Sequence, residues 1–119
     1  MNQFQAMLSC LVHGRPRFNV EVDDGVRCVV RGNRRRVVVS RSGRHVEIGR
    51  AKYPAAAIDA TLLRQRGAIE LERGRPHWEV ALRLRAGEVV EVGFSYDDVD
   101  ASIAAAALGR SIGCAVQQA

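Results

Sequence analysis

The stretch HWEVALRLRAGEVVEVGFS (77–95) indicates the fold class more clearly than any other part of this chain of 119 residues. Apolar and polar side chains alternate along 77–85 and again along 88–95, as they do in strands that bury one face. Ala86 and Gly87 supply a short turn between the two runs. The stretch therefore predicts an antiparallel hairpin. The side chains expected to face the core are Trp78, Val80, Leu82, Leu84, Val90, Val92 and Phe94.

The residues after this hairpin predict an alanine-rich helix over 97–112. Either Ser95 or Asp97 can cap it, and acids at 97, 98 and 100 suit the positive end of a helix. Gly113 can end it. Because alanine allows close approach, we expect the helix to lie against the hairpin. The contacts expected are those of Ile103 and Leu108 with Trp78, Val80, Leu82 and Leu84.

Residues 18–50 predict an antiparallel meander of four short strands, because apolar residues again recur with a period of two. Turn-forming pairs separate the strands at 24–25, 32–33 and 42–43. A further strand is expected over 68–74, so that strands fill most of 68–95.

Residues 2–13 predict an amphipathic helix, because apolar residues recur at helical spacing and Gly14 and Pro16 can stop it. These apolar residues are Phe4, Met7, Leu8, Leu11 and Val12.

Residues 54–66 favour a helix and a strand about equally. Pro54, three alanines and Gly67 suit a helix, whereas the alternation of Ile58, Ala60 and Leu62 suits a strand. Taken together, the segments predict one α+β domain over 1–119. Its expected architecture is a strongly bent antiparallel sheet, or partly open barrel, of about seven strands, with an N-terminal helix and a C-terminal capping helix.

The formal charge of +5 is unevenly distributed. Residues 1–60 carry eleven basic and five acidic residues, and 61–119 carry seven basic and eight acidic residues. A chain with one basic half favours acidic partners. Cys10, Cys28 and Cys114 are scattered, which suggests free thiols in a reducing compartment. With no signal peptide and no apolar run near the ~20 residues of a membrane span, we expect a cytoplasmic protein.

The sequence predicts a non-enzymatic protein without a cofactor or a metal ion. It has no nucleophile elbow, no nucleotide-phosphate loop and no cluster of cysteine and histidine at zinc-ligand spacing. His13, His45 and His77 are isolated from one another, and the acids of 97–100 fit the first turn of a helix.

The stretch RGNRRRVVVSRSGRHVEIGR (31–50) holds seven arginines and one acid. On paired strands these arginines can form a basic face that binds an acidic protein or an anionic headgroup; the ordinary alternative is that they protect exposed strands from aggregation. Nucleic acid is disfavoured but not excluded, because no aromatic residue lies between 19 and 52 to stack on bases. The predicted partner-binding residues are Arg27, Arg31, Arg35, Arg41 and Arg44.

The half of the chain from Tyr53 to Val116 resembles small bacterial pleckstrin-homology-like domains. The stretches that carry the resemblance are YPAAAIDATLLR, WEVALRLRAGEVVEVGF and AALGRSIGCAV. It implies a curved, partly open barrel closed by one helix, and a function as an adaptor or scaffold.

The first fifty residues, with a short helix followed by FNVEVDDGVRCVV, are similar to the start of class I type III secretion chaperones. This second resemblance implies a dimer that holds an unfolded segment of a secreted partner, and it requires a helix at 54–66. Phe4, Leu8 and Leu11 form an apolar stripe that we expect to pack at an edge or in a homodimer contact.

Overall fold

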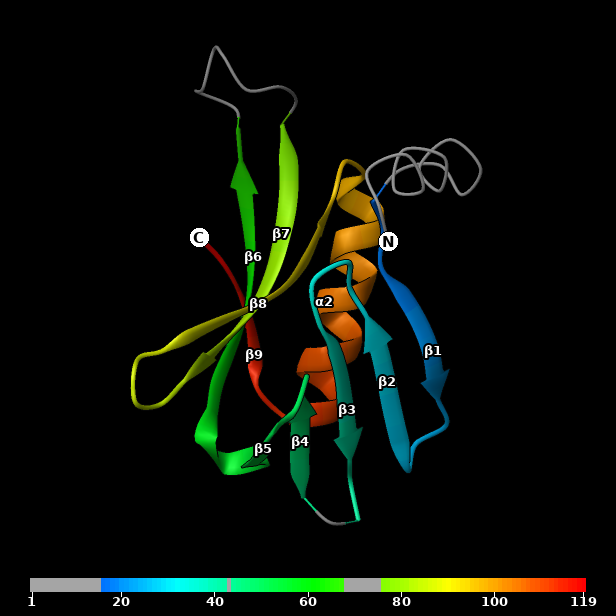
Figure 1. The fold of residues 1–119 in the computed structure, drawn as a ribbon, viewed down its shortest axis with the longest axis vertical. Helices are drawn as coiled ribbons and strands as arrows, with labels where there is room; N and C mark the ends of the chain where they lie inside the picture. Colours follow the sequence, from blue (N-terminus) through cyan, green and yellow to red (C-terminus); the bar gives the residue numbers. More distant parts are fainter. Residues whose placement is uncertain (1–15, 43, 68–75) are drawn as a thin grey trace.

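The described part of the chain forms two β-sheets, and one α-helix packs against both of them (Figure 1). The structure is a computed structural model that describes residues 16–42, 44–67 and 76–119. The helix expected at 2–13 and the strand expected at 68–74 lie outside these residues, as do the contact residues Phe4, Leu8 and Leu11.

The first sheet is a meander in which each strand pairs antiparallel with the next. Its strands are β1 (Asn19–Asp23), β2 (Arg27–Arg31), β3 (Arg36–Ser40), β4 (His45–Ile48) and β5 (Ala51–Pro54). The first four lie in 18–50, where the alternating pattern predicted them. β5 was not predicted, because it is short and has no apolar alternation.

The second sheet has the strand order β8-β7-β6-β9. Its strands are β6 (Ile58–Arg66), β7 (His77–Leu84), β8 (Val89–Ser95) and β9 (Ala115–Gln118). β7 and β8 form the predicted hairpin. β9 was not predicted; it follows the helix and pairs parallel with β6.

The predicted bent sheet or partly open barrel is wrong. The described residues form two separate sheets, of five and four strands, and no barrel closes. The break lies between β5 and β6, where Pro54 lacks an N–H and the 3-10 helix η1 (Ala55–Ala57) turns the chain away. Of the two alternatives for 54–66, the strand is correct from Ile58 onward, so the helix required by the chaperone resemblance is not found there.

The predicted C-terminal helix is α2 (Asp98–Ile112). The Asp97 carboxylate accepts the Val99 N–H at 2.9 Å and caps its first turn. Gly113 ends the helix with φ 85°, a left-handed conformation that favours glycine.

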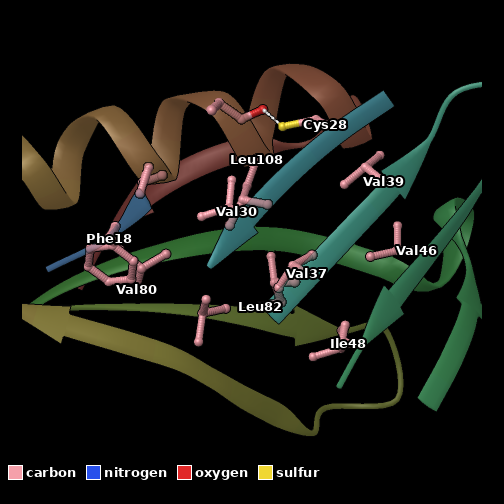
Figure 2. Close-up of a cluster of buried hydrophobic side chains, with 14 of the residues drawn as sticks. Phe18, Cys28, Val30, Val37, Val39, Val46, Ile48, Val80, Leu82 and Leu108 are labelled. Carbon is pink, nitrogen blue, oxygen red and sulfur yellow. Dashed lines mark hydrogen bonds between the residues drawn. The ribbon is translucent and has the colours of Figure 1, made fainter. Parts of the chain in front are cut away.

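The core lies between α2 and the inner faces of both sheets (Figure 2). Val30, Val37 and Val46 of the first sheet and Val80 and Leu82 of the second are fully buried there, and α2 contributes four alanines and Leu108. The prediction for Leu82 and Leu108 is confirmed, whereas that for Ile103 is wrong, because its side chain is 58% exposed. At about 100° per residue, the alanines occupy the face toward the sheets and Ile103 falls on the outer face. Trp78 is half-buried.

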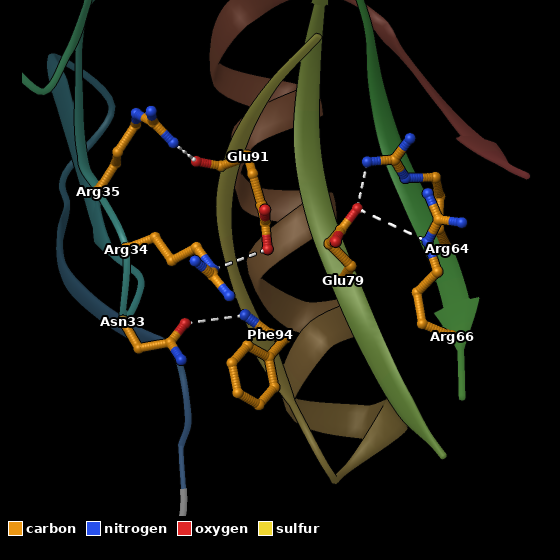
Figure 3. Close-up of polar contacts among 8 residues, drawn as sticks. All are labelled: Asn33, Arg34, Arg35, Arg64, Arg66, Glu79, Glu91 and Phe94. Atoms are coloured by element: carbon orange, nitrogen blue, oxygen red, sulfur yellow. Dashed lines mark hydrogen bonds and ion pairs between the residues drawn. The ribbon is translucent and has the colours of Figure 1, made fainter. Parts of the chain in front are cut away.

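The turn between β2 and β3 joins the two sheets at a bulge in β8 (Figure 3). In the β7–β8 register Val80 pairs with Gly93 and Ala81 with Glu91, which leaves Val92 without a partner. The Val92 carbonyl instead accepts the backbone N–H of Arg34 at 3.2 Å and of Arg35 at 3.0 Å. A bulge that frees one carbonyl thus provides the attachment point for the first sheet.

Two glycines allow this close approach. A Cβ atom on Gly32 would lie 2.2 Å from the Val92 carbonyl oxygen, and one on Gly93 would lie 2.4 Å from Oδ1 of Asn33. Both distances are far below a normal contact, so the junction requires glycine on each side.

Candidate functional site

The five arginines predicted to bind a partner do not form one stripe. Arg27 and Arg31 are at opposite ends of β2, since they pair with Ser40 and Arg36 of β3. Arg31 donates from Nε to Oε1 of Glu21 at 2.8 Å. Arg35 donates from Nη1 to the carbonyl oxygen of Glu91 at 2.7 Å and so strengthens the sheet junction. Of the five, Arg41 and Arg44 line one pocket together in the described part of the chain.

This pocket has a volume of about 560 Å³ and lies where the C-terminal end of α2 meets both sheets. The volume is within the roughly 300–1,000 Å³ common for ligand pockets. Its basic residues are Arg41 and Arg44, around the β3–β4 turn, and Arg85, in the β7–β8 turn. Its apolar wall includes Val39, Pro54, Ala55, Ile58 and Ile112. No carboxylate is among the described residues that line it. We call it the basic pocket.

Arg41 and Arg44 are positioned mainly by backbone hydrogen bonds. The Arg41 N–H donates to the Val26 carbonyl at 3.0 Å, and its Nη1 lies 3.3 Å from the Gly25 carbonyl oxygen. The Arg44 carbonyl accepts the Ala55 N–H at 2.8 Å, and Arg44 has φ 49°, which is uncommon outside glycine. Within the described part of the chain, neither side chain forms an ion pair.

Arg85 is held more firmly. Its Nε donates to the Ala56 carbonyl at 2.6 Å, and its backbone N–H donates to the Ala57 carbonyl at 2.9 Å. Its Nη1 is 3.8 Å from Oδ1 of Asp59, whose Oδ2 lies 2.7 Å from Arg83. The sequence pattern did not point to Arg85, because in sequence it is one polar residue of a strand and its neighbours in the pocket come from distant parts of the chain.

Ser111 lines the basic pocket from the last turn of α2 and is almost fully buried. Its Oγ makes no conventional hydrogen bond to the described residues; the neighbouring group is the Cys28 thiol, a weak hydrogen-bonding partner. Burial raises the pKa of that thiol, so it stays protonated and unreactive at neutral pH. A buried hydroxyl at the pocket therefore has hydrogen-bonding capacity to spare.

The electrostatics of the basic pocket have two parts. The last carbonyl groups of α2 carry partial negative charge, and the three arginines line the same pocket as Ser111, Ile112 and Gly113. The positive charges of these arginines offset the partial negative charge at the C-terminal end of α2. Asp59 partly balances Arg85, but the charges of Arg41 and Arg44, which form no ion pair with the described residues, exceed the roughly half charge of a helix terminus. The pocket therefore retains a net attraction for an anion.

A second group of polar and aromatic side chains lies on the outer face of the second sheet. The Arg34 guanidinium is 5.9 Å from the Phe94 ring centre, and Phe94 contacts His77 and Tyr96 edge-on. The structure therefore supplies an aromatic neighbour that the arginine stretch lacks in sequence. However, Arg34 is also 2.9 Å from the Glu91 carboxylate (Figure 3), which reduces its charge toward a ligand.

Glu91 belongs to a carboxylate pair with Glu79 in this group. Burial and, next, the charge of Glu79 raise the pKa of Glu91, while Arg34 opposes the shift. Glu79 in turn pairs with Arg64 and lies 4.0 Å from Arg66 (Figure 3). Each acid has a basic neighbour on an adjoining strand or turn, so the cluster connects the β2–β3 turn, β8, β7 and β6.

Comparison of the chain with family models, with curated proteins and with solved structures gave no match. In residues 16–42, 44–67 and 76–119, no three histidine, cysteine or acidic side chains are grouped so that they could hold a metal ion. No described helix is both long and apolar enough to cross a membrane.

Proposed function

We propose that the protein is a non-enzymatic binding module whose basic pocket takes an acidic segment of a partner protein. One observation carries this proposal: three arginines and no carboxylate are among the described residues that line the pocket. Guanidinium groups bind carboxylates through paired, charge-assisted hydrogen bonds, which are the stronger kind. In this proposal the binding residues are Arg41 and Arg44, which the sequence predicted, and Arg85, which it did not.

The apolar wall favours a protein segment over a headgroup. Pro54, Ala55 and Ile112 keep exposed surface and line the same pocket as the arginines, so a complete ligand needs an apolar group beside its anion. An aspartate or glutamate next to an aliphatic residue has both. We therefore expect the bound segment to place a carboxylate between Arg44 and Arg85 and an aliphatic side chain against the wall.

The arginines have different roles in this proposal. Arg85 is fixed by the Ala56 carbonyl at 2.6 Å, so its guanidinium is ordered before a ligand arrives and loses little conformational freedom on binding. Arg44 forms no ion pair with the described residues and can reorient toward the ligand. Arg85 therefore sets the position of the carboxylate, and Arg44 closes on it.

Selection from a random peptide library displayed on phage tests the proposal. Peptides that bind the native protein should be enriched in aspartate or glutamate next to an aliphatic residue. Binding of a selected peptide should weaken roughly tenfold or more for Arg44→Gln and for Arg85→Gln, because each removes a charge-assisted hydrogen bond. Arg27→Gln is the matched control, since Arg27 is exposed near the same end of the first sheet but does not line the pocket.

Three outcomes would contradict the proposal. Selected peptides without excess acid would remove the electrostatic basis, and equal losses for Arg27→Gln and Arg44→Gln would assign binding to a diffuse basic face. Tighter binding to single-stranded RNA or to vesicles containing phosphatidylserine than to any selected peptide, lost in the two pocket variants, would replace the acidic protein by one of those partners.

A further inference from the structure

The face of α2 that points away from both sheets carries exposed apolar side chains, although polar side chains are expected on the solvent-facing side of a helix. Val99 is 59% exposed and Ile103 58%, and Ala106 follows on the same side. These residues are four and three positions apart, so they form one line along the helix. We call it the outer α2 ridge (Val99, Ile103 and Ala106). Two large exposed aliphatic side chains in one line form a small apolar surface on which a short amphipathic segment can pack.

The start of the described chain is fixed beside this ridge. The Phe18 N–H donates to Oδ2 of Asp100 at 2.9 Å, and the Phe18 side chain is buried in the core. Asp100 is in the first turn of α2, between Val99 and Ile103. Phe18, near the start of the described residues, is therefore held within one helical turn of the ridge.

We propose that residues 2–13 of the same chain cover the outer α2 ridge with the apolar side formed by Phe4, Leu8 and Leu11. Gly14 and Pro16 lie between this segment and the fixed Phe18 and suit a reversal of direction. A helix of twelve residues is about 18 Å long, which exceeds the roughly 10 Å from Val99 to Ala106 along α2. The segment is therefore long enough for the ridge.

The charges of the tether suit the same placement. Arg15 and Arg17 lie between residues 2–13 and Phe18, and the N-terminal end of α2 carries exposed Asp97 and Asp98, so the tether and this end of the helix attract each other. The short tether also raises the effective concentration of the segment at the ridge to the millimolar range. A second copy of the chain would have to compete with this intramolecular contact.

A photo-crosslinking amino acid at position 103 of the full chain tests the proposal. We expect crosslinks from position 103 to residues 2–13 within one chain, and none from the same group at Val26, an exposed valine in the β1–β2 turn. Mixing ¹⁴N- and ¹⁵N-labelled protein separates contacts within a chain from contacts between chains. Crosslinks between differently labelled chains would overturn the proposal in favour of a dimer, and so would the absence of crosslinks to 2–13.

Hydrogen exchange gives a second measurement that needs no modified residue. If residues 2–13 cover the ridge, Ile103→Gln should speed the exchange of their backbone amides at least tenfold. Val26→Gln is the control, because it changes an equally exposed apolar side chain elsewhere. Equal exchange rates in the native protein and Ile103→Gln would also overturn the proposal.

Discussion

Oδ1 of Asn33 accepts the backbone N–H of Phe94 at 2.9 Å, so one side chain in the first sheet occupies a hydrogen-bonding position on the edge of the second. Together with the two bonds to the Val92 carbonyl, it makes the β2–β3 turn behave as an added piece of strand beside β8. The relative position of the sheets therefore depends on a few backbone groups as well as on the core.

Gly32→Ala should open this junction. The new Cβ would lie 2.2 Å from the Val92 carbonyl oxygen and 2.8 Å from its carbonyl carbon, and backbone atoms cannot move aside as a flexible side chain can. We expect the free energy of unfolding to fall by more than ~1 kcal/mol, in the range of overpacking substitutions. Urea unfolding measures it.

Gly25→Ala is the control for this substitution, because Gly25 has φ 86° but a Cβ atom added there would meet only open space. It reports the cost of an alanine in the left-handed conformation, about 1–2 kcal/mol; Gly32 has no positive φ, so a loss of stability in Gly32→Ala comes from the close contact instead. If Gly32→Ala left the unfolding midpoint unchanged, the close approach of the turn to β8 would be wrong.

Leu82→Ala should destabilise the protein by roughly 2–5 kcal/mol, because Leu82 is fully buried among residues of both sheets and α2. Val26→Ala, at a side chain 62% exposed, should change stability by less than about 0.5 kcal/mol. Chemical denaturation of both variants measures the difference. Equal stabilities would contradict the placement of β7 in the core.

Glu91 and Glu21 should affect stability with opposite dependence on pH. Burial raises the folded-state pKa of Glu91 above 4.5, so its stabilising contribution is present below that pH and is lost as pH rises through the folded value. The hydrogen bond from Arg31 lowers the pKa of Glu21, so its contribution is present above pH 4.5 and is lost as pH falls.

Glu91→Gln should therefore gain stability relative to the native protein between about pH 4.5 and 7, and Glu21→Gln should lose stability there. Thermal unfolding at several pH values measures both. Parallel curves for the native protein and Glu91→Gln would show that ionised Glu91 is not disfavoured in the fold.

The two described thiols should differ in reactivity. Cys28 is 1% exposed, and burial raises its pKa, whereas Cys114 is partly exposed and its Sγ lies 3.4 Å from Oγ1 of Thr61. In a Cys10→Ser background, an aromatic disulfide reagent should modify Cys114 in the folded protein and Cys28 only after unfolding. Fast modification of both thiols would place Cys28 outside the core.

Local patterns in the sequence predicted the elements that depend on neighbours in sequence. The β7–β8 hairpin follows from alternation around Gly87, and α2 follows from Asp97, the alanines and Gly113. The division into two sheets did not follow, because it depends on Pro54 and on contacts between residues about sixty positions apart, such as Asn33 with Phe94.

The candidate site, too, depends on contacts between distant parts of the chain that local sequence patterns do not predict. The arginine density of 31–50 pointed to Arg41 and Arg44, but no local signal joins them to Arg85. Arg31 and Arg35 were also predicted to bind a partner, because strand alternation gives the face on which a side chain lies and not the group that it contacts. In the structure Arg31 donates to Glu21 and Arg35 donates to the Glu91 carbonyl, and both acceptors come from other strands.

The parallel pairing of β6 with β9 has a consequence for the order in which the protein folds. Every strand pair in the first sheet joins consecutive strands, so each can form as a local hairpin within microseconds. The β6–β9 pair instead brings Ala60 next to Ala115, across both remaining strands of its sheet and the whole of α2. Closing so long a loop carries an entropic cost that only the finished helix and hairpin can offset. β9 should therefore join last in refolding, and until it does, the edge of β6 is a transient site for misassociation between chains.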